Sequence, residues 1–354
     1  MVEAPGQDIA FNPTSVHTVI MRNPPLRIGL VGAGHFGRYH ALKVAASSRA
    51  VLAGVHDRHE ERARAVGAEA GAPPLDLPAL LETCDAVIVA VPAAAHHAIA
   101  AAALSAGKHV LVEKPIAATL AEADELAALA AARGLVLQVG HLERFSAAHG
   151  AVSGRLGPPL YIEATRIAPF KPRGTDVSVI LDLMIHDLDL VLSLTDSPID
   201  SVEAVGAPVA SAHEDIANAR IRFASGAVAT ITASRVAART ERRMRIFARD
   251  GYLAVDFANR RLNMIRRGPG QALPGLEGFG LEEVSWQDHD ALAAEQAAFI
   301  AAVLDGGPVV VDAAAGRRAL AAALAVSDAM AASRERMEAS GLIQKPQHGG
   351  SSGL

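Results

Sequence analysis

Residues 26–37 read LRIGLVGAGHFG, an apolar run that passes into the pattern G-x-G-x-x-G at Gly32, Gly34 and Gly37. The apolar run predicts a buried strand, and residues 36–46 suit the helix that would follow it. Gly32 permits a tight turn, Gly34 lets the backbone approach a pyrophosphate, and Gly37 lets helix and strand pack closely. Glycine patterns of this kind are weak alone, but the strand before and the helix after make this one a predicted dinucleotide site.

The second strand of this region ends beside a carboxylate. Asp57 follows the apolar run 50–56 and lies 25 residues after Gly32. A carboxylate there can accept hydrogen bonds from both ribose hydroxyls and would repel a 2′-phosphate, so we expect NAD, with NADP the weaker alternative. Arg58 blurs this choice, since it could pair with a 2′-phosphate, stack on adenine or lie in water at the start of a helix.

Strand-like and helical runs alternate from residue 26 to about residue 140. The strand-like runs are almost continuously apolar, as expected for strands buried on both faces of a parallel sheet, and residues 120–133 have helical spacing. We therefore expect an α/β fold whose N-terminal part is a Rossmann doubly wound parallel sheet. The expected strands are residues 26–32, 50–56, 86–91, 109–113 and 136–139.

After residue 150 the pattern changes to strand-like runs joined by short turns. Ser225-Gly226 and Asp250-Gly251 are typical of hairpins. This predicts a C-terminal α+β domain on a mostly antiparallel sheet, whose open face is a candidate surface for a homodimer or homotetramer. The expected strands are residues 160–167, 199–207, 217–224, 227–233, 243–248 and 252–257, with helices at 177–194, 288–304 and 313–333.

The length of 354 residues exceeds what one core usually serves, which favours two domains. We expect a flexible leader and a flexible tail around an NAD-binding domain, a domain for substrate and oligomerisation, and a C-terminal helix that packs back on the first domain. In chain order these parts cover residues 1–25, 26–145, 146–312, 313–338 and, for the tail, 339–354.

The composition excludes several classes of protein. Hydrophobic residues make up 51% and charged residues 20%, and the net charge of −5 gives no basic surface for nucleic acid. Cys84 is the one cysteine, so neither an internal disulfide nor a Cys-x-x-Cys zinc site is possible. We find no signal-peptide pattern and no convincing membrane span, and we expect the protein in the cytoplasm.

Three further segments carry a family resemblance: VPAAAH at 91–96, AGKHVLVEKP at 106–115 and DLMIHD at 182–187. With the glycine turn they closely resemble the glucose-fructose oxidoreductase / inositol dehydrogenase / rhizopine-catabolism (Gfo/Idh/MocA) family. The resemblance implies an NAD(P)-dependent dehydrogenase that acts on a CH–OH group. The family usually has Thr-Pro at Val91-Pro92, so this chain lacks one hydroxyl near the cofactor. The remaining residues expected beside the cofactor are His35, Phe36, His96, Glu113 and Lys114.

Lys114 is the first catalytic candidate. Glu113-Lys114-Pro115 ends a predicted parallel strand, where such sheets build their sites, and Pro115 restricts Lys114 to an extended backbone. A cation there could hold the reacting oxygen and stabilise charge as the hydroxyl loses its proton. The alternative is a surface lysine at a strand end. The resemblance implies the catalytic role, places Glu113 near the nicotinamide and suggests a cis peptide before Pro115.

Asp182 and His186 are the second pair of catalytic candidates. They are four residues apart and share one face of a predicted helix. A carboxylate beside an imidazole can orient it and raise its basicity, and polar residues in so apolar a helix need a reason. The alternative is a His–Asp pair that only holds two domains together. The resemblance implies that these positions supply the general base, and it leaves open whether His186 or Lys114 accepts the proton.

Other polar residues near these motifs carry weaker expectations. His96 is either a packing residue at a helix start or, by the resemblance, a residue on the cofactor side. Asp187 and Asp189 could bind sugar hydroxyls or lie in water. The histidines and carboxylates show no spacing that stands out as a metal site, and hydride transfer needs no metal, so we expect none.

A set of cations around the predicted catalytic helix suggests the substrate. The segments that carry these cations, together with the helix, look most like those of the UDP-N-acetylglucosamine 3-dehydrogenases. Those enzymes oxidise the sugar 3-hydroxyl to a ketone, a step toward the 3-amino sugars of lipid A or surface glycans. Guanidinium groups suit a diphosphate, although the cations could equally be a solvated loop. The expected substrate-binding residues, besides Lys114 and His186, are His141, Arg144, Arg166, Lys171 and, less firmly, Arg173.

Two other functions remain open from the sequence. A dehydrogenase for an inositol or a free sugar would need no cationic cluster for a diphosphate. A non-catalytic NAD-binding regulator would keep the glycine turn but could lose Lys114 or His186, and both are present. Because one fold hosts many functions, the fold alone does not decide among these.

Overall fold

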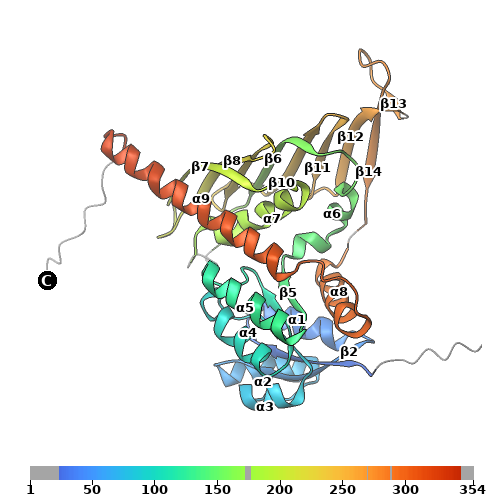
Figure 1. The fold of residues 1–354 in the computed structure, drawn as a ribbon, viewed down its shortest axis with the longest axis vertical. Coiled ribbons are helices and arrows are strands. Elements are labelled where there is room, and N and C mark those ends of the chain that lie inside the picture. Colours follow the sequence, from blue (N-terminus) through green and yellow to red (C-terminus); the bar gives the residue numbers. More distant parts are fainter. Residues whose placement is uncertain (1–23, 172–176, 269, 288, 344–354) are drawn as a thin grey trace, which may run out of the picture.

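The computed structural model describes residues 24–171, 177–268, 270–287 and 289–343. Most of the expected leader and tail therefore lies outside the described residues. Figure 1 shows two layered units joined by the helices near the C-terminus. The predicted fold class is confirmed, with a parallel sheet in the first unit and a mostly antiparallel sheet in the second.

The first unit is a parallel sheet in the order β2-β1-β3-β4-β5. Its strands are short, and all but the edge strand β2 are mostly buried, which explains why they appear in the sequence as continuous apolar runs. The strands are β1 (Leu26–Val31), β2 (Ala50–His56), β3 (Ala86–Val89), β4 (His109–Glu113) and β5 (Leu137–Gly140). The helical segments are α1 (His35–Ala45), α2 (Glu60–Ala70), α3 (Leu77–Thr83), η1 (Ala93–Ala95), α4 (His96–Ser105) and α5 (Leu120–Arg133).

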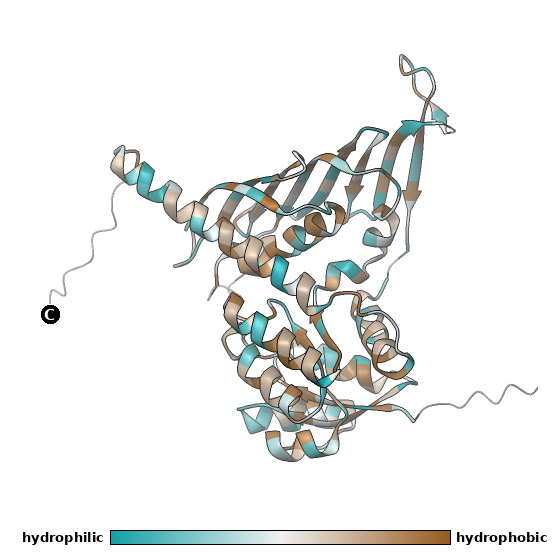
Figure 2. Cartoon of the chain, viewed as in Figure 1, coloured by the Kyte–Doolittle hydropathy of each residue, from teal (hydrophilic) through white to brown (hydrophobic). Residues whose placement is uncertain are grey.

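The second unit is a sheet in the order β13-β14-β12-β11-β10-β6-β9-β8-β7, in which only β6 and β9 pair in parallel. Residues on its strands alternate between buried and accessible, and Figure 2 shows hydrophobic and hydrophilic bands along these strands. The strands are β6 (Pro159–Ile167), β7 (Ile199–Ala207), β8 (Ile216–Phe223), β9 (Val228–Ser234), β10 (Glu241–Ala248), β11 (Gly251–Asp256), β12 (Arg261–Arg267), β13 (Gln271–Ala272) and β14 (Phe279–Ser285).

One face of this sheet is covered by α7 (Ile185–Leu194), which a π-helical turn, η3 (Ile180–Met184), precedes. The short segments η2 (Leu142–Phe145) and α6 (Ala147–Val152) connect the two units. The predicted helix at 177–194 is thus present, but its first turns are wound more widely than an α-helix.

Two C-terminal helices tie the units together. Although α8 (Ala291–Asp305) falls within the range expected for the second domain, its buried Phe299 and Ile300 pack in the core around β1 and α1. The start of α9 (Ala313–Ala339) lies on β5, and its later turns pack on β7 and α7. Within the described residues, no helix is both long and apolar enough to cross a membrane.

Candidate active site

The turn between β1 and α1 has the geometry that a dinucleotide requires. Gly32 has φ +101°, and a Cβ on Gly37 would lie 1.8 Å from the Gly32 carbonyl oxygen. A Cβ on Gly34 would instead project into open space, with no atom within 4 Å. No side chain caps the N-terminus of α1, so its first N–H groups are available to an anion. These residues fit the pyrophosphate of NAD.

Asp57, at the end of β2, is bonded to this turn. Its Oδ2 accepts a hydrogen bond from the Ala33 N–H at 2.7 Å, and its Oδ1 accepts one from the His59 N–H at 2.8 Å. Arg58 is exposed and its Nε lies 3.1 Å from His59 Nε2. The carboxylate therefore sits at the turn, while the neighbouring guanidinium lies in solvent.

Aromatic rings flank the open side of the turn. Phe36 is 50% exposed, and His35 meets both Phe36 and Tyr39 edge-on, with ring centroids 6.1 and 5.0 Å apart. An exposed phenyl ring at the mouth of a helix N-terminus is an apolar surface open to a ligand.

His96 joins the turns that follow β3 and β4. Its Nδ1 lies 2.6 Å from the Pro115 carbonyl oxygen and its Nε2 lies 2.8 Å from that of Val91. The ring is buried, and the peptide between Lys114 and Pro115 is cis. His96 thus links two of the three segments that carry the family resemblance, 91–96 and 106–115.

Lys114 reaches from β4 across to the π-helical turn η3. Its Nζ donates hydrogen bonds to the Asp182 carbonyl oxygen at 2.8 Å and the Leu181 carbonyl oxygen at 3.2 Å. Burial lowers the pKa of Lys114, and the charges of Asp182 and Glu113 oppose this only in part. The lysine is therefore a half-buried amine whose pKa is shifted toward the neutral form.

His186 and Asp182 lie near Lys114 but not as the expected pair. In the part of the chain that the structure describes, no hydrogen bond joins the Asp182 carboxylate to the imidazole, and His186 Nδ1 is buried without a partner. Burial lowers the pKa of His186 well below its usual value, and the charges of Lys114 and Arg166 lower it further. The expectation that Asp182 raises the basicity of His186 is therefore not met, because the carboxylate acts on Lys114 instead.

His141 follows β5 and faces the same group. Both its ring nitrogens are buried and, among the described residues, have no hydrogen-bond partner. Burial, together with the charge of Lys114, lowers the pKa of His141 to about 3. Arg144 lies one turn further on, with a buried, unpartnered Nε and an Nη1 that is 3.5 Å from Asp189 Oδ1.

Arg166 has a different environment from the one expected of a phosphate ligand. It is 4% exposed, and its Nε and Nη2 donate to the two oxygens of Asp187 at 2.7 and 2.9 Å. Its Nη1 donates to Glu143 at 3.0 Å, and Arg242 also pairs with Glu143. The planar donor pair that would grip a phosphate is thus already used.

Two other predicted cations follow Arg166 along the chain. Lys171 is exposed, and Arg173 lies outside the described residues. The sequence reasoning missed Glu143 and Arg242 as members of this buried network. The signal available in the sequence was Glu143 itself, an acidic residue in the segment GHLERF at 140–145. Its partners Arg166 and Arg242 are 23 and 99 residues away along the chain.

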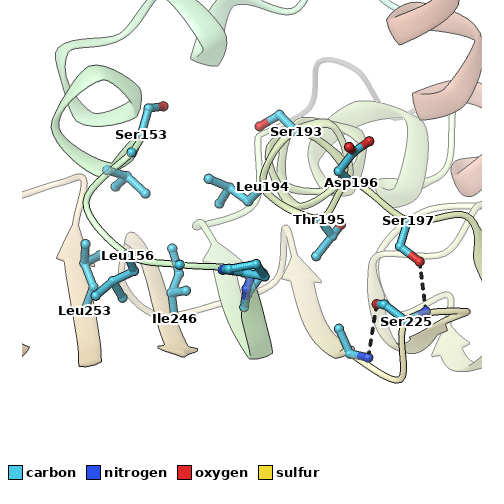
Figure 3. A pocket seen from close by; sticks show the side chains of 16 residues that line it. Ser153, Leu156, Ser193, Leu194, Thr195, Asp196, Ser197, Ser225, Ile246 and Leu253 are labelled. Atoms are coloured by element: carbon cyan, nitrogen blue, oxygen red, sulfur yellow. Dashed lines mark hydrogen bonds between the residues drawn. The ribbon is translucent and has the colours of Figure 1, made fainter. Parts of the chain in front are cut away.

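Two open hollows lie elsewhere in the second unit. One of about 550 Å³ is bounded by the loop 153–159 and the end of α7, and its lining is small, hydroxylic or apolar apart from Asp196 (Figure 3). The other, of about 580 Å³, lies on the open face of the sheet over β10, β11, β12 and β14. Neither includes Lys114 or His186, so neither is the predicted catalytic site.

Comparison with known families matches both units. The profile described as "Oxidoreductase family, NAD-binding Rossmann fold" matches residues 26–141. The profile described as "GFO/IDH/MocA C-terminal domain" matches residues 147–254.

Individual relatives extend this match. UDP-N-acetylglucosamine 3-dehydrogenase from Acidithiobacillus ferrooxidans is 45% identical over 88% of this chain and 99% of that protein. A solved structure of that enzyme superposes with a TM-score of 0.82 over 87% of this chain and 98% of the other. Myo-inositol 2-dehydrogenase from Thermotoga maritima is 27% identical over 83% of this chain and 93% of its own length.

Proposed function

The chain belongs to the GFO/IDH/MocA family of NAD-binding oxidoreductases, and from this membership we propose that it oxidises the 3-hydroxyl of UDP-N-acetylglucosamine to a ketone. The observation that carries the proposal is the 45% identity to a UDP-N-acetylglucosamine 3-dehydrogenase over 99% of that enzyme's length. Inositol dehydrogenases match at 36% identity or less, several over about half of this chain. A 3-keto sugar would suit a following aminotransferase that makes a 3-amino sugar.

Lys114 is the proposed proton acceptor. A neutral amine has two N–H groups and one lone pair. The carbonyl oxygens of Leu181 and Asp182 take up both N–H groups, so the lone pair is left for the proton of a sugar hydroxyl. Bound NAD supplies the acceptor for the hydride. His186 is the weaker candidate for the base because burial and nearby cations hold down its pKa.

His141 and His186 are proposed to hold the substrate. A buried ring nitrogen without a partner costs free energy that a ligand hydroxyl can recover. Three such nitrogens lie on these two rings, and both rings lie within electrostatic reach of Lys114. Arg166 is proposed to fix Asp187 and Glu143 rather than touch the nucleotide, which leaves Arg144 and Lys171 as the candidate ligands for the diphosphate.

We propose NAD rather than NADP as the cofactor. Asp57 is held at the glycine turn by the Ala33 N–H, and its charge would repel a 2′-phosphate. Exposed Arg58 makes no contact that would neutralise this carboxylate.

Self-association through the larger sheet is also part of the proposal. Tyr161, Phe247 and Tyr252 form an aromatic cluster on three neighbouring strands, with ring centroids 5.6 and 4.9 Å apart. Their chain neighbours Ile162, Ile246 and Leu253 point into the core, so the rings lie on the open face of the sheet. An aromatic patch of this kind suits a symmetric interface with a second copy.

The test is a panel of substrates with NAD or NADP, followed by NADH absorbance and by mass spectrometry for a product that has lost two hydrogens. We expect turnover of UDP-N-acetylglucosamine with NAD, and poor turnover of free N-acetylglucosamine because the binding energy of the nucleotide is lost. Good turnover of myo-inositol without reaction or binding of the nucleotide sugar would instead favour an inositol dehydrogenase. Tight NAD binding with no reaction across the panel would favour a regulator.

A further inference from the structure

A second group of polar side chains is buried beside Glu113. Glu295 on α8 is 0% exposed, and neither of its carboxyl oxygens has a hydrogen-bond partner among the described residues. The side-chain oxygens of Gln138 and Gln296 are also buried and unpartnered. Nothing in the proposed reaction uses this group.

Glu113, in contrast, is surrounded by donors. Its Oε1 lies 2.8 Å from His40 Nε2, and its Oε2 accepts the Lys114 backbone N–H at 3.2 Å. Gln296 Nε2 donates to His40 Nδ1 at 3.0 Å and to the His40 carbonyl oxygen at 3.1 Å. Because Nδ1 accepts, the imidazole proton is on Nε2 and points at Glu113.

The two carboxyl groups are too close for both to be charged. One oxygen of Glu113, one of Glu295 and His40 Nε2 all lie within 4.8 Å of one another. Two like charges at this separation in the interior force one group to keep its proton. The donors around Glu113 favour its anion, and Glu295 has no donor that would favour its own.

These three residues also have the composition of a metal site. A metal would need a free lone pair on His40 Nε2, and that nitrogen carries the proton that Glu113 accepts. The geometry therefore favours a proton over a metal ion.

We propose that Glu113 and Glu295 together hold one proton, that this proton resides on Glu295, and that Glu295 is thereby a positioning residue that keeps Glu113 a single, fixed anion beside Lys114. The consequence for catalysis rests on the proposed function, but the protonation itself does not. Of the ionisable groups on the surrounding elements, Glu113 is the one whose charge acts on Glu295. His40 faces the pair from α1, and Lys43 pairs with Asp290 at the outer end of α8.

The first test is the free energy of unfolding as a function of pH for the wild type and Glu295→Gln, which keeps the shape and a neutral charge. Burial raises the pKa of Glu295 well above its usual value. As pH rises, the unfolded chain therefore loses this proton before the folded protein does, and the wild type loses stability. Relative to Glu295→Gln, its unfolding constant should rise by up to about tenfold per pH unit above roughly pH 5.

Glu283→Gln is the matched control, because Glu283 is an exposed glutamate on β14. Its curve should stay parallel to that of the wild type. Parallel curves for Glu295→Gln and the wild type would overturn the proposal.

The second test does not depend on the variant folding. Infrared spectroscopy of wild-type protein with isotope-labelled glutamate should show the stretching band of a protonated glutamic acid at neutral pH, distinct from any aspartic acid. Absence of that band, or a stoichiometric metal in elemental analysis of the wild type, would contradict the proposal that Glu295 holds the proton. Neither test uses a sugar substrate, so failure here is separate from failure of the proposed function. If the protonation of Glu295 and the proposed function both hold, the rate of NADH formation should depend on pH differently in the wild type and in Glu295→Gln at alkaline pH.

Discussion

Lys114 and Arg166 are two basic residues whose surroundings shift their pKa values in opposite directions. The guanidinium of Arg166 delocalises its charge and faces two carboxylates, which together raise its pKa. The amine of Lys114 meets two neutral carbonyl groups, and burial lowers its pKa. The sequence predicted both residues near the site, but it could not predict these shifts, because the partners of Arg166 lie 21 and 23 residues away. Loss of Arg166 would leave the buried Asp187 carboxylate without its counter-charge. We therefore expect its main effect to be a loss of fold stability, with weaker substrate binding as a secondary effect.

Replacing Lys114 tests its role as base. Lys114→Ala should cut turnover by roughly 10²-fold or more, the usual scale for a positioned acid–base group. In the wild type, turnover should rise with pH as Lys114 loses its proton, at lower pH than for an ordinary lysine because its pKa is lowered. Steady-state rates across pH measure both effects.

Lys108→Ala is the control for this substitution, because Lys108 precedes β4 at the end of the strand opposite Lys114, where its Nζ donates to the Cys84 carbonyl oxygen. It should keep the turnover and the pH profile. His186→Gln should raise KM more than it lowers kcat if His186 holds substrate rather than a proton. Near-normal turnover of Lys114→Ala would place the chemistry elsewhere.

Among the helices and strands, the sequence predicted best those whose hydrophobic period and terminal residues indicate the same structure. The ranges of β2, β4, β7 and α5 coincide with those expected, since strand-like runs mark the three strands and a capped amphipathic pattern marks the helix. Strands β12, β13 and β14 were not predicted. The accessible faces of β12 and β14 carry charged residues, and β13 is only two residues long, so only tertiary pairing makes these segments strands. The π-helical turn η3 was not predicted either, because its width is set by packing rather than by propensity.

Asp57 joins two elements, because it connects the end of β2 to the turn between β1 and α1. Asp57→Asn and Asp57→Ala should both reduce the preference for NADH over NADPH, since each removes the charge that repels a 2′-phosphate. Asp57→Ala should also weaken NADH binding, because the Ala33 N–H loses its acceptor. Fluorescence titration with each cofactor measures the dissociation constants. Tighter NADPH binding by the unmodified protein would reverse the assignment.

At the scale of the whole molecule, α9 connects the two sheets. A Cβ at Gly316 would lie 2.6 Å from Val139 on β5, so the helix approaches the Rossmann sheet there without room for a side chain. Further along, Met330 lies against Gly206 on β7. The sequence predicted that this helix returns to the first domain, but its contact with the second sheet follows only from its length of 27 residues.

Asp189 lies where α7, η2 and α9 meet, and its ionisation tests how these elements hold together. Its Oδ2 is buried without a partner among the described residues, Arg144 is 3.5 Å from the other oxygen, and the charge of Arg318 on α9 reaches it. Burial raises the pKa of Asp189 to about 7, whereas an unfolded aspartate has a pKa of about 3.9. Between about pH 4 and pH 7 the folded protein keeps a proton that the unfolded chain has lost, so the contribution to stability is full below this window and declines as pH rises through it.

Asp189→Asn removes that decline, and the gap in the free energy of unfolding between the variant and the wild type, measured by denaturant titration at each pH, should therefore widen by a few kcal/mol from about pH 4 to pH 7 and then stay constant. Asp200→Asn, at an exposed aspartate of β7, is the control and should follow the wild type throughout. A gap that does not change with pH would mean that Asp189 is already ionised and paired with Arg144 at low pH. In that case α7 and η2 are held by a charged contact, and substitutions at Arg144 and Asp189 should destabilise the protein to the same extent above about pH 4.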